Sequence, residues 1–177
     1  MSKNLNIPNI LAFIRLLIAP LMYLLLVNRN LFSIHPSWLD FWAAFLFVLA
    51  SITDFFDGYI ARELDQVTKL GAILDPLADK MLTLAGFLGL LVLGRADPWA
   101  IYLILTREFF ITGLRVSAAS QGLEVAASMA GKIKTIIQMI AIGFLIMQWP
   151  GGTLLLWIAV ALTLYSGYEY TKAYLKV

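Results

Sequence analysis

The sequence predicts an all-α integral membrane protein with about six transmembrane helices. Its 177 residues are 61% hydrophobic and 14% charged, and their mean hydropathy is +0.85. Soluble domains carry about 25% charged residues, so this composition indicates a chain that lies in a bilayer. Spans of about 20 residues with short connections fill the whole length. We therefore expect a single membrane domain over residues 1–177 and no separate soluble domain.

Apolar runs between polar breaks define the expected spans. Asp97 and Pro98 are typical of a helix start, and the Pro150-Gly151-Gly152 sequence predicts a tight turn. These signals separate the third span from the fourth and the fifth from the sixth. The six expected spans cover residues 9–27, 38–60, 72–93, 99–114, 132–149 and 153–170.

Basic residues indicate the orientation of these spans. An even number of spans places both termini on one side of the membrane, and only Arg29 and Arg95 then fall in the opposite loops. Loops on the cytoplasmic side carry an excess of Lys and Arg, so both termini are expected to be cytoplasmic. The basic residues at that face are Lys3, Arg62, Lys69, Arg115, Lys132, Lys134, Lys172 and Lys176.

Polar residues inside the spans gather near the cytoplasmic ends of five of them. An ionisable residue within a bilayer is costly and usually faces a cavity or a partner, so this layer predicts one polar cavity open to the cytoplasm. The alternative from another class of protein is a cation channel or transporter. It needs polar residues through the full depth of the membrane, whereas the outer halves of the six expected spans are nearly free of charge. The residues of the layer are Asn9, Arg15, Asp54, Asp57, Asp75, Asp79, Lys80, Arg107, Glu108, Lys132 and Lys134.

Four aspartates form the most informative part of this layer. Asp54 and Asp57 share one helix face, as do Asp75 and Asp79, because residues three or four apart lie on the same side of a helix. A short hairpin sets the two pairs against each other. Converging carboxylates repel unless cations compensate, and the hard ions Mg²⁺ and Mn²⁺ prefer oxygen ligands. The sequence therefore predicts a divalent-metal site, which a purely structural membrane protein would not need.

Small residues lie one turn from these acids. They lie on the same helix faces as the aspartates and would let a ligand approach the backbone; these residues are Gly58, Ala61 and Gly71. Close packing of two helices through small residues is the structural alternative for each of them.

The complete pattern Asp-x2-Asp-Gly-x2-Ala-Arg-x8-Gly-x3-Asp-x3-Asp, from Asp54 to Asp79, resembles the signature of the CDP-alcohol phosphotransferases. The resemblance implies a six-helix membrane fold, usually homodimeric, with two divalent cations, Mg²⁺ or Mn²⁺. It implies that Asp54, Asp57 and Asp75 bind metal and that Asp79, also at the metal site, is the general base. The residues it places around the CDP group are Asp54, Gly58, Ala61, Arg62 and Gly71.

This assignment agrees with the chemistry of phosphoryl transfer. Metal ions on a diphosphate neutralise its charge and stabilise the CMP leaving group, while a carboxylate accepts the proton of an attacking hydroxyl. The bilayer would hold the acyl tails of the donor, and the cytoplasmic mouth would admit a soluble acceptor.

The acceptor is predicted from basic residues outside the signature. Arg107 and Arg115 are eight residues apart near the fourth span, and Lys132 and Lys134 open the fifth. Such a cationic set suits a phosphorylated acceptor. As the alternative, these residues anchor the cytoplasmic face, and Arg107 pairs with Glu108 or another acid.

Further segments resemble one branch of the family, the phosphatidylglycerolphosphate synthases. They are Asn6-Ile7-Pro8-Asn9 with Arg15 and Pro20, Thr106-Arg107-Glu108 with Leu114-Arg115, and Gly131-Lys132-Ile133-Lys134-Thr135 with Gln138. This resemblance implies transfer of a phosphatidyl group from CDP-diacylglycerol to sn-glycerol 3-phosphate.

Sister enzymes remain the nearest alternative: cardiolipin synthase and the phosphatidylserine and phosphatidylinositol-phosphate synthases. We expect a multi-pass protein of a bacterial inner or plasma membrane, with a cytoplasmic active site, membrane lipids around it and a homodimeric assembly. The net charge of +2 is too small to indicate a nucleic-acid partner.

Overall fold

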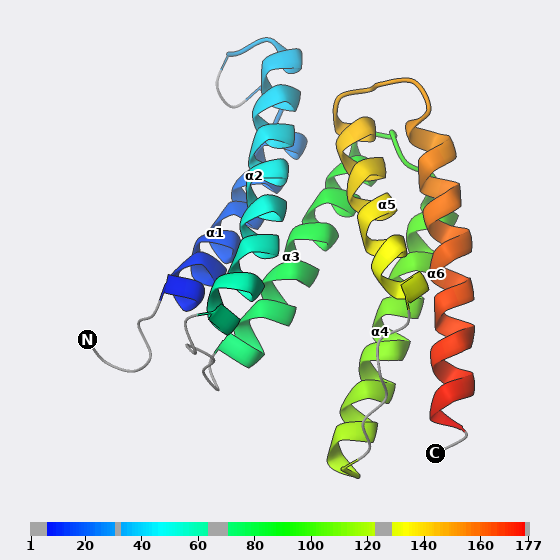
Figure 1. Ribbon diagram of the computed structural model, residues 1–177. Coiled ribbons are helices and arrows are strands. Elements are labelled where there is room, and N and C mark those ends of the chain that lie inside the picture. The colour runs from blue at the N-terminus through cyan, green and yellow to red at the C-terminus, as the bar shows by residue number, and fades with distance from the viewer. Residues whose placement is uncertain (1–6, 31–32, 64–70, 123–128, 176–177) are drawn as a thin grey trace. The chain divides into compact units, whose positions relative to one another are not determined.

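The computed structural model describes residues 7–30, 33–63, 71–122 and 129–175 (Figure 1). Side chains are described for these residues except 7, 8, 54–63, 72, 73, 75 and 76. All regular elements within these ranges are α-helices, which confirms the predicted all-α class. The chain divides into two compact units, Met1–Arg95 and Ala96–Val177.

The first unit contains α1 (Ile7–Val27), α2 (Pro36–Glu63) and α3 (Gly71–Val92). Helix α1 packs against both α2 and α3, and its buried face includes Ala12, Ala19 and Leu26. The contact with α3 is close, because a Cβ added at Gly89 would lie 2.6 Å from Cδ1 of Leu26. Small residues permit this approach of two helices in a membrane protein.

The second unit contains α4 (Pro98–Ser120), α5 (Met129–Ile146) and α6 (Gly152–Tyr174). The predicted helix start is confirmed, since the side chain of Asp97 accepts from the backbone amides of Trp99 and Ala100, with Pro98 in the first turn. The predicted turn before α6 is also confirmed. Gly151 has a φ of 89°, a conformation that glycine adopts without strain, and α6 begins at the next residue.

The observed helices follow the predicted spans to within a few residues, except that α4 continues to Ser120, beyond the expected end at residue 114. Three helices in the described part of the chain are long and apolar enough to cross a membrane. They are α1, α2 and α5, through the segments Asn9–Val27, Pro36–Thr53 and Met129–Ile146. Spans through α3, α4 and α6 remain predictions.

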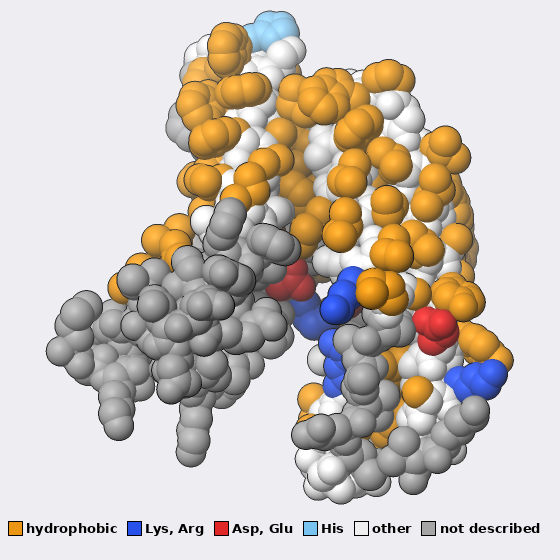
Figure 2. All heavy atoms as spheres, viewed as in Figure 1, with side chains coloured by type: hydrophobic (Ala, Val, Ile, Leu, Met, Phe, Trp, Pro, Cys, Tyr) orange, Lys and Arg blue, Asp and Glu red, His pale blue; other side chains and the backbone are white. Residues whose placement is uncertain are grey.

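Many large apolar side chains lie on the outside of the helices. Leu17 is 72% exposed, Trp99 70% and Leu154 67%. On the visible face of the second unit, charged side chains appear near the beginning of α5 and the end of α6, and apolar side chains cover the other half (Figure 2). An apolar outer surface of this kind suits a hydrocarbon environment, where charged groups are costly.

Candidate active site

The signature aspartates occupy the adjoining ends of two consecutive helices. Asp54 and Asp57 lie in the last turns of α2, and Asp75 and Asp79 lie in the first turns of α3. The helical backbone confirms that the two members of each pair share a helix face. The side chains of Asp54, Asp57 and Asp75 lie outside the described residues, among which no group of three or more His, Cys, Asp or Glu could hold a metal. The convergence of the four acids therefore remains a prediction.

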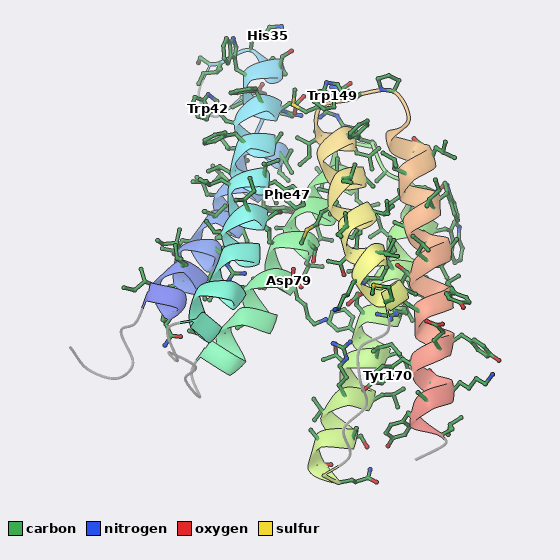
Figure 3. The ribbon with its side chains drawn as sticks, in the orientation of Figure 1. His35, Trp42, Phe47, Asp79, Trp149 and Tyr170 are labelled. Atoms are coloured by element: carbon green, nitrogen blue, oxygen red, sulfur yellow. The ribbon has the colours of Figure 1, made fainter. Side chains whose placement is uncertain are left out.

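Asp79 is the signature acid whose side chain is described. It is half-buried on α3, where Figure 3 labels it, and its neighbour Ala78 is completely buried. Its backbone carbonyl accepts a hydrogen bond from Oγ1 of Thr83 at 3.1 Å. The carboxylate thus stands on a regular helix turn, next to residues that pack in the core of the first unit.

The residues predicted to surround the CDP group belong to the same two helix ends. Gly58, Ala61 and Arg62 lie in the last turns of α2, with side-chain surroundings outside the described residues. Gly71 is the first residue of α3 and is buried. The predicted hairpin between the helices also lies outside the described residues.

Two of the four predicted basic residues meet in the second unit. Oε1 of Glu108 on α4 accepts from Nζ of Lys134 on α5 and lies 3.3 Å from Nη1 of Arg107. The side chains of Lys134 and Arg107 are only 7% and 11% exposed. The pairing of Arg107 with Glu108, which the sequence left open as an alternative, is therefore observed. We call Arg107, Glu108 and Lys134 the buried cationic cluster, because it joins two cations to one carboxylate.

Helix α6 contributes a second contact to this cluster. Nη2 of Arg107 donates a hydrogen bond to Oγ of Ser166 at 2.9 Å. A Cβ added at Gly167 would lie 3.1 Å from Cγ of Arg107. Sequence reasoning missed both α6 residues, although a Ser-Gly pair within an apolar helix was a visible signal. Among the described residues, no acceptor reaches Nε of Arg107.

The other two predicted basic residues lie on the surface of the second unit. Arg115 is exposed, and its guanidinium lies 5.4 Å from the centre of the Tyr170 ring on α6. Figure 3 labels Tyr170 on that helix. Lys132 is exposed near the start of α5. In the described part of the chain, the structure places neither of them in an ion pair with Glu108.

Two buried, uncharged polar residues of the second unit lie one helix turn from Lys134 and Ser166. Gln138 lies one turn beyond Lys134 on α5, and Thr163 lies one turn before Ser166 on α6. Both residues are at least 95% buried, and neither Oε1 of Gln138 nor Oγ1 of Thr163 has a partner among the described residues. An unsatisfied buried polar group costs about 1–3 kcal/mol, and a hydrogen bond from water or from a polar ligand group to either atom would remove that cost.

The first unit holds a separate ionic cluster that the sequence did not reveal. Oδ1 of Asp40 accepts from Nη2 of Arg29, and its Oδ2 accepts from Nη2 of Arg95 at 2.8 Å. Asp40 lies in the second turn of α2, at the end opposite to Asp54 and Asp57. We call Asp40, Arg29 and Arg95 the loop-end cluster, because both arginines lie just beyond the ends of helices.

Comparison with known proteins decides the family. The profile of the CDP-alcohol phosphatidyltransferase family matches residues 5–165. The chain belongs to this family. The match includes the signature aspartates and both predicted sets of binding residues, so the sequence resemblance is confirmed at the family level.

Several curated members of the CDP-alcohol phosphatidyltransferase family are similar over most of this chain. Those from Rickettsia prowazekii and Bacillus subtilis are both named CDP-diacylglycerol--glycerol-3-phosphate 3-phosphatidyltransferase. The Rickettsia prowazekii protein is 42% identical, over 98% of this chain and 97% of its own length. The Bacillus subtilis protein is 46% identical, over 72% of this chain and 70% of its own length. A probable phosphatidylglycerophosphate synthase from Mycobacterium tuberculosis is 36% identical over 99% of this chain and 84% of its own.

Proposed function

We propose that this chain transfers the phosphatidyl group of CDP-diacylglycerol to sn-glycerol 3-phosphate, giving phosphatidylglycerolphosphate and CMP. Family membership and the names of relatives at 36–46% identity support the donor and the reaction. The observation that carries the choice of acceptor is the buried cationic cluster. Two buried cations within the polar layer suit a phosphorylated acceptor better than an uncharged alcohol.

Two divalent cations, Mg²⁺ or Mn²⁺, fit the donor set of the signature. Asp54, Asp57, Asp75 and Asp79 supply only carboxylate oxygens, the ligands that these hard ions prefer, and the helix ends carry them in two same-face pairs. When bound, such ions neutralise the diphosphate and stabilise the departing CMP. Asp54, Gly58, Ala61, Arg62 and Gly71 are proposed to bind the CDP group.

Asp79 is proposed to hold the proton of the reaction. Its carboxylate accepts the proton of the acceptor hydroxyl as the hydroxyl oxygen attacks the phosphorus of the donor. Its half-buried position on α3, in the same helix end as Asp75, supports this role by placing a carboxylate beside the proposed metal ligands. A general base of this kind contributes about 10²–10⁴-fold to a rate.

The basic residues are proposed to bind the phosphate of the acceptor. Arg107 keeps a buried Nε–H without an acceptor among the described residues, and Lys134 carries a compact charge beside it. A guanidinium recognises a phosphate with two parallel hydrogen bonds, and an ammonium adds a point charge. Arg115 and Lys132, which are exposed, are proposed to attract the acceptor to the site.

The topology proposed for the enzyme has six spans in one membrane domain. Both termini and the active site are cytoplasmic, in a bacterial inner or plasma membrane, and the enzyme is a homodimer. The distribution of basic residues supports this orientation, and the bacterial relatives support the location.

Product analysis of the purified protein tests the proposed function. The full chain is incubated with CDP-diacylglycerol, Mg²⁺ and one acceptor at a time: glycerol 3-phosphate, phosphatidylglycerol, serine or inositol phosphate. We expect phosphatidylglycerolphosphate as the main product, and a different preferred acceptor would contradict the proposal. Excess chelator should abolish turnover, and Mg²⁺ or Mn²⁺ should restore it. Full turnover in chelator would overturn the metal assignment.

Substitution of Asp79 tests the proposed base. Asp79→Asn keeps an oxygen ligand but cannot accept a proton, so kcat should fall about 10²-fold or more with smaller changes in both KM values. Asp65→Asn, outside the four proposed ligands, is the matched control and should change kcat less than about twofold. A near-normal kcat for Asp79→Asn would assign the proton to another group.

A further inference from the structure

Gly167 on α6 leaves space that the side chain of Arg107 occupies. A Cβ added at Gly167 would lie 3.1 Å from Cγ and 3.2 Å from Nε of Arg107, closer than an ordinary van der Waals contact. At Gly113 on α4 and Gly143 on α5, an added Cβ would meet nothing within 4 Å. Of these three glycines, only Gly167 leaves space that another side chain, that of Arg107, fills.

Ser166 fixes one edge of the same guanidinium. Its hydroxyl donates to the backbone carbonyl of Thr163 at 3.1 Å, so its lone pairs remain to accept the 2.9 Å hydrogen bond from Nη2 of Arg107. Ser166 is only 1% exposed, which protects this bond from competing water. On the other edge, Nη1 of Arg107 lies 3.3 Å from Oε1 of Glu108. The guanidinium is held by residues of two helices.

Close helix packing is the simpler explanation for a Ser-Gly pair in a membrane helix. That explanation requires the backbone of a neighbouring helix to approach the glycine. The atoms nearest to the added Cβ at Gly167 instead all belong to the side chain of Arg107, namely Cγ, Nε and Cδ. The space at Gly167 thus determines the path of one side chain rather than the distance between two helices.

We propose that Gly167 and Ser166 are positioning residues, which fix the direction of the Arg107 guanidinium for recognition of the acceptor's phosphate. This inference rests on the proposed function of Arg107. Gly167 and Ser166 act through Arg107, because Cγ, Cδ and Nε of Arg107 pack against Gly167 and its Nη2 donates a hydrogen bond to Ser166. A guanidinium held in advance loses less conformational freedom when a ligand binds, so the pair lowers the KM for glycerol 3-phosphate.

Alanine substitution at Gly167, with matched controls, tests the proposal. The full-length variants Gly167→Ala, Gly113→Ala and Gly143→Ala are purified and compared by steady-state kinetics. Gly167→Ala should raise the KM for glycerol 3-phosphate about tenfold, as expected for loss of an aligned charged hydrogen bond. The KM for CDP-diacylglycerol should change less than about twofold, and both controls should leave both KM values within about twofold. An unchanged acceptor KM in Gly167→Ala would overturn the proposal.

Ser166→Ala provides a second test that adds no atoms. It removes the acceptor of Nη2 without filling any space, so it carries the test if Gly167→Ala does not fold. The acceptor KM should rise about three- to tenfold, with the KM for CDP-diacylglycerol unchanged. Equal rises in both KM values would indicate a general loss of structure and would overturn the proposal.

A double-substitution cycle separates this inference from the proposed function. If Gly167 acts through Arg107, Gly167→Ala should change the acceptor KM less than about twofold in an Arg107→Gln background. If the effects of Gly167→Ala and Arg107→Gln on the acceptor KM multiplied in the double variant, the two residues would act independently. That result would overturn the positioning proposal, although the role of Arg107 would stand. If Arg107→Gln alone left the acceptor KM unchanged, the proposed function of Arg107 would fail, and the positioning proposal with it.

Discussion

The two ionic clusters have the same composition but different geometry. Each joins a carboxylate to two cations, yet Asp40 contacts Arg29 through Oδ1 and Arg95 through Oδ2, whereas Oε1 of Glu108 contacts both Arg107 and Lys134. The Asp40 side chain is 6% exposed and that of Glu108 is 21% exposed. Each arginine of the loop-end cluster therefore has its own carboxylate oxygen, whereas Arg107 and Lys134 share one oxygen of Glu108.

This difference separates a structural ion cluster from a candidate binding site. In the loop-end cluster, Asp40 connects the residues that follow α1 and α3 to the beginning of α2, so it closes one end of the first unit. In the buried cationic cluster, Arg107 retains an Nε–H with no acceptor in the described part of the chain. An N–H donor that is held in place but has no acceptor can bind a ligand anion. A cluster in which each cation has its own carboxylate oxygen serves mainly to fix the fold.

The largest expected effect concerns the loop-end cluster. Asp40→Asn removes the charge that two poorly exposed arginines share, and breaking such a pair on one side costs about 3 kcal/mol. The thermal midpoint of the full-length protein in detergent should fall by several degrees. The KM for glycerol 3-phosphate should not change.

Asp97→Asn is the matched control for this prediction, because asparagine caps a helix about as well as aspartate. Its thermal midpoint should stay close to that of the parent protein. If Asp40→Asn raised the acceptor KM instead of lowering the midpoint, the two clusters would not have separate roles.

The second expected effect concerns the buried cationic cluster. Arg107→Gln removes the charge and the fork of donors, which should raise the KM for glycerol 3-phosphate about thirtyfold, the equivalent of about 2 kcal/mol. Arg107→Lys should recover only part of this loss, since an ammonium cannot reproduce two parallel hydrogen bonds. The KM for CDP-diacylglycerol should stay within about twofold of the parent value.

The slow transfer to plain glycerol supplies the control for Arg107. No phosphate is present in that acceptor, so Arg107→Gln should leave the rate with glycerol nearly unchanged. An equal loss with both acceptors would show that Arg107 maintains the structure and does not recognise a phosphate.

Local patterns in the sequence predicted most of the fold. Apolar runs placed all six helices, the Asp97-Pro98 pair marked the start of α4, and the glycines after Pro150 marked the turn before α6. Each of these signals acts over a few neighbouring residues, so it can be read without knowledge of the packing. The continuation of α4 to Ser120 was not predicted, because residues 115–120 lie beyond the apolar run that defined the expected span.

Contacts between distant residues were the part that the sequence did not predict. Asp40 meets Arg95, and Arg107 meets Ser166, only because the packing of helices brings them together. The basic character of Arg107 and Lys134 was visible in the sequence, but their common partner was identified only as one alternative for Arg107. The function was therefore predicted from residue types and from the resemblance to a known family, whereas the distinction between the two clusters required their geometry.

The smallest expected effects concern the exposed basic residues. Arg115 and Lys132 both face outward, and Arg115 lies over the ring of Tyr170. Exposed charges attract a ligand through solvent and are screened by salt, so Arg115→Gln and Lys132→Gln should each raise the acceptor KM only about two- to threefold. Added salt should reduce these differences, while the larger effect of Arg107→Gln should persist because its side chain is only 11% exposed. Equal, salt-sensitive effects of all four basic residues on the acceptor KM would show that burial does not distinguish phosphate binding from attraction through solvent. If substitution of Arg115 or Lys132 altered membrane insertion but left the acceptor KM unchanged, these two residues would be topology anchors.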